Sequence, residues 1–315
     1  TKLESKSGKW PLVNKNIVQF RDYAKANGVG YQKLDGVIVD LLQTLFYVEF
    51  ATLNSQSIMK GWSTGRATNT DLAVLTETNV NRIALPNATA ALYAVGQPIG
   101  IGSTRDGNQI CYGRNITSIG INDDAGTGNR YITFDGDPVN IATGNYLYNV
   151  GWKSGFSSGI SAKSGSIGSN STGKFPCMYR GIENPWGSVW QFVDGININE
   201  HQAWICKNPA DYASNLFASP YQQLSYVNAT AEGSISQMGF DPAHPEFNFP
   251  TSVTGGGYNK YYCDSYFSAA GKNGTLLGGR WNYSDSNGLS YWFMAFASWE
   301  TEFSVGGRLV KKALE

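Results

Sequence analysis

The spacing of apolar residues predicts two helices at the start of the chain. Residues 14–27 place apolar side chains three or four positions apart, and Asn27 with Gly28 forms a turn signal that ends the pattern. Residues 37–60 contain neither Gly nor Pro and again carry apolar side chains at helical spacing. We expect one amphipathic helix, then one long and mostly buried helix that ends at Gly61. The apolar residues at helical spacing are Ile17, Phe20, Tyr23 and Ala24 in the first helix, and Ile38, Leu41, Leu42, Leu45 and Val48 in the second.

The pattern changes at about residue 63. As far as residue 152, short β-prone pieces alternate with Gly, Asn and Asp turns, which predicts a small β-rich subdomain. Residues 156–174 are nearly all Ser and Gly, typical of a loop or linker. Beyond them short strands are expected among Trp, Gly and Tyr. We predict an α+β protein with N-terminal helices in 1–62, a β-rich insert in 63–152 and a further domain in 153–315.

The balance of charges argues against nucleic acid or an anionic membrane as a partner. The 315 residues include 24 Lys and Arg and 24 Asp and Glu, so no net field attracts nucleic acid or an anionic membrane. The longest apolar run, residues 37–59, contains polar and acidic side chains that a bilayer would reject, and no membrane insertion is expected. No signal peptide is recognised at the start. The high Gly count (37) and aromatic share (13%) favour tight turns and aromatic packing.

The residues that usually carry catalysis or bind metals are sparse. His201 and His244, the two histidines, lie outside any nucleophile or metal motif. Glu183 and Asp194 could form a glycosidase pair, which needs a fixed separation that sequence does not establish. Loop 122–129 is acidic but lacks the order of a calcium loop, so an Asx-rich turn is favoured. No catalytic residue, metal or cofactor is predicted. The four cysteines, expected to be buried free thiols, are Cys111, Cys177, Cys206 and Cys263.

Three motifs in order resemble a known branch of proteins. GSVWQFV (187–193) is similar to the GNVWEWV signature of the formylglycine-generating-enzyme-like branch of C-type lectin folds. GGRW (278–281) resembles that branch's RGGSW, and VGGRLV (305–310) resembles its closing GFR. The resemblance implies a C-type lectin fold outside the β-rich insert. Oxidising members carry reactive cysteines shortly after the second motif, but residues 278–310 contain none, so no enzyme is expected.

The C-terminal segment also resembles the variable region of proteins diversified by retroelements. The frame consists of LGG-W (277–281), GL-YW (288–292) and GGRLV (306–310), and residues 41–61 look like a helix of phage and prophage structural proteins. The resemblance implies a hypervariable ligand-binding surface within 278–310, on a phage tail or a bacterial cell surface. The implied variable positions are Arg280, Tyr283, Ser284, Asp285, Ser286, Ser290, Phe293, Ala295, Phe296 and Thr301. The implied scaffold positions are Trp186, Trp190, Gly278, Gly279, Trp281, Trp292, Gly306 and Gly307.

In the resembled family, adenine-directed mutagenesis of an Asn codon produces many of these residue types. It cannot produce Met294, Trp299, Glu300 or Glu302, so these four are either fixed scaffold or a departure from the family's pattern. Tyr and Phe offer contact area at low entropic cost and Ser adapts its hydrogen bonds, which suits a protein or glycan ligand on a bacterial surface. We expect Tyr283, Phe293 and Phe296 to be displayed, so that replacing them by Ala abolishes binding and barely changes the melting temperature. The two glycine pairs are expected to adopt backbone shapes closed to other residues.

Three alternatives stay open at this point. The aromatic residues could belong to the core, although the charges of Arg280, Asp285, Glu300 and Glu302 place part of the segment outside. The protein could be a formylglycine-generating-enzyme-like or hydrolytic enzyme. It could also be a structural tail component that makes its contacts through the β-rich insert.

Overall fold

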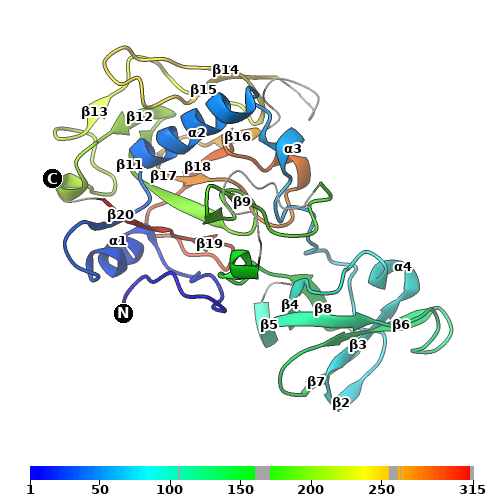
Figure 1. Ribbon diagram of the computed structural model, residues 1–315. Helices are drawn as coiled ribbons and strands as arrows, with labels where there is room; N and C mark the ends of the chain where they lie inside the picture. Colours follow the sequence, from blue (N-terminus) through cyan, green and yellow to red (C-terminus); the bar gives the residue numbers. More distant parts are fainter. Residues whose placement is uncertain (106, 160–170, 255–261, 263, 313–315) are drawn as a thin grey trace.

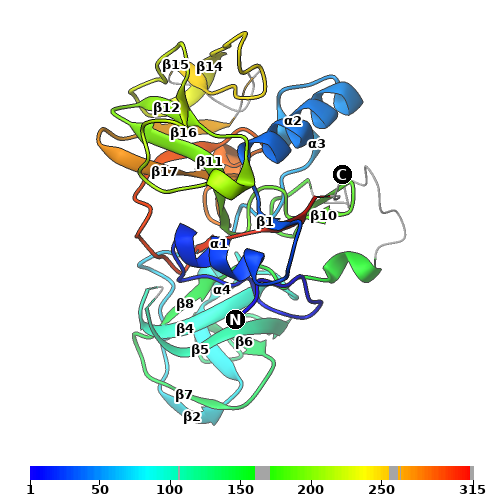
Figure 2. The ribbon, with the colours of Figure 1, turned by 90° about the vertical axis from the view of Figure 1, so that its left-hand side faces the viewer.

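The protein has a mixed α+β fold in which strands predominate, as the sequence predicts (Figure 1). The computed structural model describes residues 1–105, 107–159, 171–254, 262 and 264–312. Two bodies are visible: a core built around a large curled sheet, and a smaller β-rich body that extends from one end of it (Figures 1 and 2). Cys263 and most of the Ser/Gly stretch lie outside the described residues.

The core sheet has nine strands in the described part of the chain. Neighbouring strands are antiparallel, except that β16 runs parallel to β18 and β19 (Val305–Gly306) runs parallel to β11. The order across the sheet is β13 (Gln222–Gln223), β12 (Gln202–Ile205), β11 (Trp190–Asn199), β17 (Lys272–Leu277), β18 (Trp292–Phe296), β16 (Ser265–Ser268), β14 (Gly233–Met238) and β15 (Pro250–Thr254).

Side chains of β11 and β18 alternate between the two faces of this sheet, as the pleat of a strand requires. Val193 and Trp292 pack in the core below helix α2 (Gly36–Phe50). Phe192 and Phe293 point to the other face, where helix α1 (Ile17–Lys25) contributes its apolar side. Figure 2 shows α2 on one side of the sheet and the orange-red chain that follows β18 on the other.

The first predicted helix is confirmed as α1. The side chain of Asn16 accepts a hydrogen bond from the Gln19 backbone and the side chain of Gln19 bonds back, a capping box that fixes the start of the helix.

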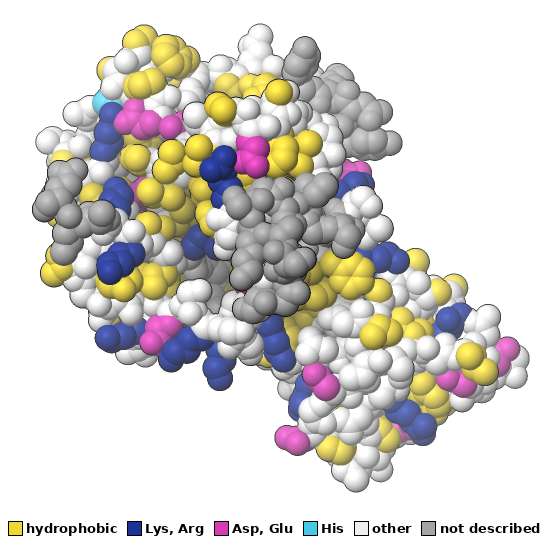
Figure 3. Space-filling model, viewed as in Figure 1, with side chains coloured by type: hydrophobic (Ala, Val, Ile, Leu, Met, Phe, Trp, Pro, Cys, Tyr) yellow, Lys and Arg dark blue, Asp and Glu magenta, His cyan; other side chains and the backbone are white. Residues whose placement is uncertain are grey.

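The second predicted helix is interrupted. Asp35 caps α2, and Ala51 ends it in a left-handed conformation (φ 51°), so a separate short helix α3 (Ser55–Ile58) follows. The prediction that this helix is mostly buried is also wrong, because Leu41 is 50% and Val48 79% exposed. Figure 3 shows apolar side chains on the surface where α2 lies in Figure 1. Within the described residues, no helix is long and apolar enough to span a bilayer.

The body that extends from the core lies within residues 63–152 and has its own apolar core. Branched apolar side chains such as Ile83, Ile101 and Ile132 are fully buried there, apart from the core sheet. Its strands are β3 (Arg82–Pro86), β6 (Asn129–Phe134), β5 (Gly107–Ile119), β4 (Pro98–Thr104) and β8 (Tyr146–Asn149) in one sheet, with β2 (Glu77–Val80) paired to β7 (Val139–Ile141) and a short helix α4 (Asn87–Ala90).

Short pairings tie the chain ends and loops to the two bodies. β1 (Tyr31–Lys33) pairs with β20 (Leu309–Lys311), so the end of the described chain runs beside the segment that joins α1 to α2. The indole of Trp62 donates to the carbonyl of Val150 at 2.9 Å and holds the insert to the core. The remaining elements are β9 (Met178–Tyr179), β10 (Ile182–Glu183) and the 3-10 turns Phe156–Gly159, Pro209–Asp211 and Ser284–Ser286.

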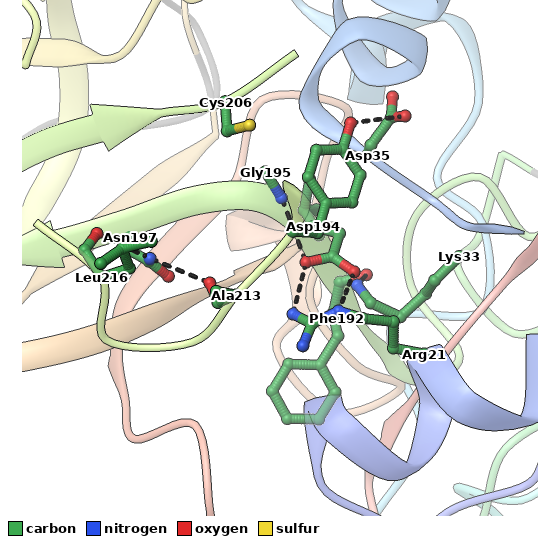
Figure 4. Close-up of polar contacts among 12 residues, drawn as sticks. Arg21, Lys33, Asp35, Phe192, Asp194, Gly195, Asn197, Cys206, Ala213 and Leu216 are labelled. Carbon is green, nitrogen blue, oxygen red and sulfur yellow. Dashed lines mark hydrogen bonds and ion pairs between the residues drawn. The ribbon is translucent and has the colours of Figure 1, made fainter. Parts of the chain in front are cut away.

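A buried carboxylate, Asp194 on β11, joins the N-terminal segment to the sheet (Figure 4). Arg21 of α1 donates two hydrogen bonds to it, at 2.9 and 2.7 Å. Burial alone would raise the pKa of Asp194, but the charge of Lys33 and the bonds from Arg21 outweigh it and hold that pKa below its usual value. Lys33 is itself fully buried and donates to the carbonyl of Phe192 at 2.9 Å.

Removing Arg21 should destabilise the fold strongly. Arg21→Met leaves the charge of Asp194 buried without its bidentate partner, which costs about 3–5 kcal/mol. Chemical denaturation would measure the loss. The matched control is Arg82→Met, which breaks a largely exposed pair with Glu77 and should change the free energy of unfolding by less than about 1 kcal/mol. Equal losses in both variants would contradict this role of Asp194.

Lys33 should make stability depend on pH in the alkaline range. Burial lowers the pKa of Lys33 to about 8 in the folded protein, whereas an unfolded lysine has a pKa of about 10.4. Above pH 8 the unfolded chain therefore holds a proton that the folded protein has released. Between pH 8 and about 9.5 the free energy of unfolding should rise by on the order of 1 kcal/mol more in the wild type than in Lys33→Met. Parallel pH profiles of the two proteins in urea titrations would contradict the expectation.

Candidate functional site

The segment between Gly278 and Ser304 is the candidate site. It leaves β17, forms a long loop, contributes β18 to the middle of the core sheet and returns through a second loop to β19. The three sequence motifs meet here. The backbone of Gly187 donates to Gly278 at 2.9 Å, and Gln191 of β11 pairs with Gly306 of β19.

The backbone of the first loop is held by groups that lie outside the segment. Gln43 of α2 donates to the carbonyl of Leu289 at 2.9 Å, and Asp264 accepts from the backbone of Ser290 at 2.7 Å.

Two further bonds to the loop involve backbone atoms alone. Ser284 donates to the carbonyl of Ser63 at 2.8 Å, and Gly65 donates to that of Trp281 at 2.6 Å. These bonds reach backbone atoms, so they do not themselves require particular side chains at the loop positions that they hold.

The four scaffold tryptophans are buried. Trp186 and Trp281 are inaccessible, and Trp190 and Trp292 are nearly so. Gly278 and Gly279 both have left-handed backbones, with φ of 94° and 82°, as expected for the first glycine pair.

The second glycine pair does not adopt the expected backbone shape that is closed to other residues. Neither Gly306 nor Gly307 has a positive φ. Space is the constraint instead: a Cβ on Gly307 would lie 2.7 Å from the ring of Phe20, and one on Gly306 would lie 3.1 Å from the carbonyl oxygen of Leu12.

Three of the predicted contact residues form a half-buried aromatic floor, defined as Tyr283, Phe293 and Phe296. The rings of Tyr283 and Phe293 lie 5.7 and 5.5 Å from Trp190, measured between centroids, and Phe296 lies 5.7 Å from Phe192. These residues therefore contribute to the core as well as to the surface. Their joint replacement by Ala would remove packing around Trp190 and Phe192, so we now expect it to lower the melting temperature as well as to weaken binding.

Phe267 belongs to the same face and was missed in the sequence. Its ring lies 5.1 Å from that of Phe293, on the parallel neighbour β16. The alternation of Tyr266, which is buried in the opposite core, with half-buried Phe267 is the signal that could have found it.

Polar side chains surround the aromatic floor. Arg280 pairs with Glu302 at 2.6 Å and lies 5.0 Å above the ring of Tyr283. Asp285 pairs with Lys60 at 3.0 Å. Of the other predicted positions, Ser284 and Thr301 are exposed, and Ser286 and Ala295 are half-exposed.

The prediction that Ser290 is displayed on the binding surface is wrong. Only 1% of this residue is exposed, its hydroxyl lies 2.9 Å from that of Tyr47, and its backbone bonds to Asp264. These partners lie far away in the sequence, so the residue types around Ser290 do not reveal its burial. By contrast Trp299, outside the predicted set, is 65% exposed.

Three of the groups considered for catalysis, Glu183, Asp194 and His201, make structural contacts. Glu183 accepts hydrogen bonds from the backbones of Gly155 and Ser157, and Asp194 is held by Arg21. His201 lies 2.8 Å from the hydroxyl of Ser268, which is itself buried.

The described cysteines are free and buried, as predicted. Burial raises the pKa of Cys177 to about 12, so its thiol stays protonated at neutral pH.

In the part of the chain that the structure describes, no cluster of three or more His, Cys, Asp or Glu side chains could hold a metal ion. In loop 122–129, Asp123 and Asp124 accept backbone hydrogen bonds from Gly128 and Tyr131, so these carboxylates brace the turn.

Comparisons with known proteins add no assignment to this geometry. No family model matches the chain, and no curated protein matches it significantly.

Proposed function

We propose that this protein is a non-enzymatic ligand-binding protein whose 278–304 surface is diversified by a retroelement and displayed on a C-type lectin scaffold. The observation that carries the proposal is the way the segment is held. Partners outside the segment bond to its backbone, and a half-buried aromatic floor supports the residues above it.

The scaffold part of the proposal rests on the convergence of three separated motifs. Residues 187–193, 278–281 and 305–310 contact one another through Gly187, Gly278 and the pairing of β11 with β19. Buried tryptophans lie at the first two motifs. This convergence supports the C-type lectin scaffold that we propose from the resemblance to the formylglycine-generating-enzyme-like branch.

The binding part of the proposal rests on the composition of the face. Arg, Tyr and Phe lie together with small hydroxyl residues at its edge, and the charge of Arg280 is balanced by Glu302. Such a mixture binds through shape and apolar contact more than through net charge. We place the protein on a phage tail or a bacterial cell surface, with a ligand on a bacterial surface.

The gene's surroundings test the proposal directly. A near-copy of the codons for residues 278–310 should lie downstream, beside a reverse transcriptase gene, and should differ from the gene mainly where the copy carries adenine. Sequencing of the locus in many isolates should show changes at exposed positions such as Thr301 and none at Trp281. Invariant C-terminal codons with no neighbouring copy would refute diversification.

The exposed positions should accept large residues, whereas the buried one should not. Ser286→Tyr and Thr301→Tyr should each change the free energy of unfolding by less than about 0.5 kcal/mol, because their side chains reach solvent. Ser290→Tyr, the control, overfills a buried site and breaks its hydroxyl contact with Tyr47, at a cost of at least about 2 kcal/mol. Thermal and urea unfolding would compare the three variants. Equal losses of unfolding free energy in all three would contradict the proposal that the exposed positions can be replaced freely.

A further inference from the structure

We propose that Arg308 holds a chloride ion in a small cavity where the three sequence motifs meet. The inference goes beyond the proposed function and does not depend on it. It concerns the scaffold beneath segment 278–304 and not the ligand that the segment binds.

The cavity lies between helix α2 and the core sheet. Its walls are almost entirely apolar, and they include Val39 and Leu42 of α2 and Leu277 at the end of β17. The polar side chains at the cavity are Gln191 from the first motif and Arg308 from the last. The cavity therefore presents one cation to an otherwise apolar space.

The hydrogen bonds of Arg308 all go to neutral acceptors. Its Nε donates to Oε1 of Gln191 at 2.8 Å, and its Nη2 donates to the carbonyls of Glu183 and Asn184 at 2.8 and 2.9 Å. Among the residues that the structure describes, Arg308 forms no ion pair and its Nη1 makes no hydrogen bond. The guanidinium thus keeps a whole positive charge and one uncommitted donor group.

This charge is largely buried, which makes a missing counter-charge costly. Burial lowers the pKa of Arg308 to about 10, so the side chain is still a cation at neutral pH. Glu183 opposes that shift without cancelling it, because its carboxylate accepts hydrogen bonds from the backbones of Gly155 and Ser157. Arg21, the other buried arginine of the core, has Asp194 beside it. An anion at Arg308 would supply what Asp194 supplies there.

The size of the cavity identifies the class of anion. Its volume is about 10 Å³, close to the least that holds one water molecule. Sulfate, phosphate and carboxylate-bearing molecules are too large for this space. A halide ion is only slightly larger than water, and Leu42 is partly exposed, so the wall that it forms can move outward. Chloride fits the donor set because Nη1 supplies a charged hydrogen bond and the apolar walls supply no competing acceptor.

Binding of the ion should stabilise the folded protein by mass action. Thermal unfolding of the full chain would be followed at one ionic strength in sodium chloride and in sodium gluconate, whose anion is too large for the cavity. We expect the melting temperature to be higher in chloride by at least about 2 °C. In crystals grown with sodium bromide, an anomalous peak should lie in contact with Nη1 of Arg308.

Two variants locate the effect. Arg308→Met removes the cation and should unfold at the same temperature in both salts. Because this change also removes three hydrogen bonds, Leu42→Trp provides a second test that keeps Arg308 and fills the cavity from a partly exposed position. It too should lose the response to chloride. The matched control Leu41→Trp lies on the same helix, is 50% exposed in the wild type and does not line the cavity, so it should keep the response.

Other results would overturn the proposal. Equal melting temperatures of the wild type in the two salts would do so, as would a water molecule in the cavity of crystals that hold bromide only elsewhere. A response to chloride that persists in Leu42→Trp would place the ion at another site. None of these results affects whether segment 278–304 binds a ligand, so the proposed function is tested separately.

Discussion

The buried charge of Asp194 is the constraint on which the core depends. A carboxylate in the middle of a sheet is tolerated only when cations and donors surround it, and here they come from the N-terminal segment: Arg21 from α1 and Lys33 from β1. The backbone of Asp194 also donates to the carbonyl of Leu34 at 2.8 Å, next to the residue that caps α2. The first two helices are thereby fixed on opposite faces of the same strand, and β20 completes the arrangement by pairing with β1.

The same strand sets the floor of the candidate site. Phe192 lies two positions before Asp194; its carbonyl accepts from Lys33, and its ring lies 6.0 Å from Phe20 and 5.7 Å from Phe296. Trp190, two residues earlier on the same face, supports Tyr283 and Phe293. The ionic cluster and the two residues that support the aromatic floor therefore lie on one face of a single strand.

The sequence predicts those features that depend on neighbours along the chain. The helical spacing around Phe20, the turn at Asn27 and the buried tryptophans of the motifs are of this kind, and the structure confirms each. It does not predict features that depend on distant partners. The second helix stops at Ala51 without a glycine, and Ser290 is buried by Tyr47 and Asp264, which lie elsewhere in the chain. The half-burial of Phe293 likewise follows from the register of β18 against its neighbours, which residue types alone do not determine.

The structure divides the proposed variable positions by how freely each can change. Thr301 is exposed, so its side chain can change at little cost in packing. Ser284 also reaches solvent, but its φ of 51° lies in the left-handed region, where Asn, Asp and Gly are tolerated better than branched residues. Tyr283 and Phe293 rest on Trp190, so replacements there must restore contact with an indole or lose stability. Diversity on this face is therefore graded by burial: the outermost positions set specificity, while the floor positions couple any change in specificity to the stability of the core.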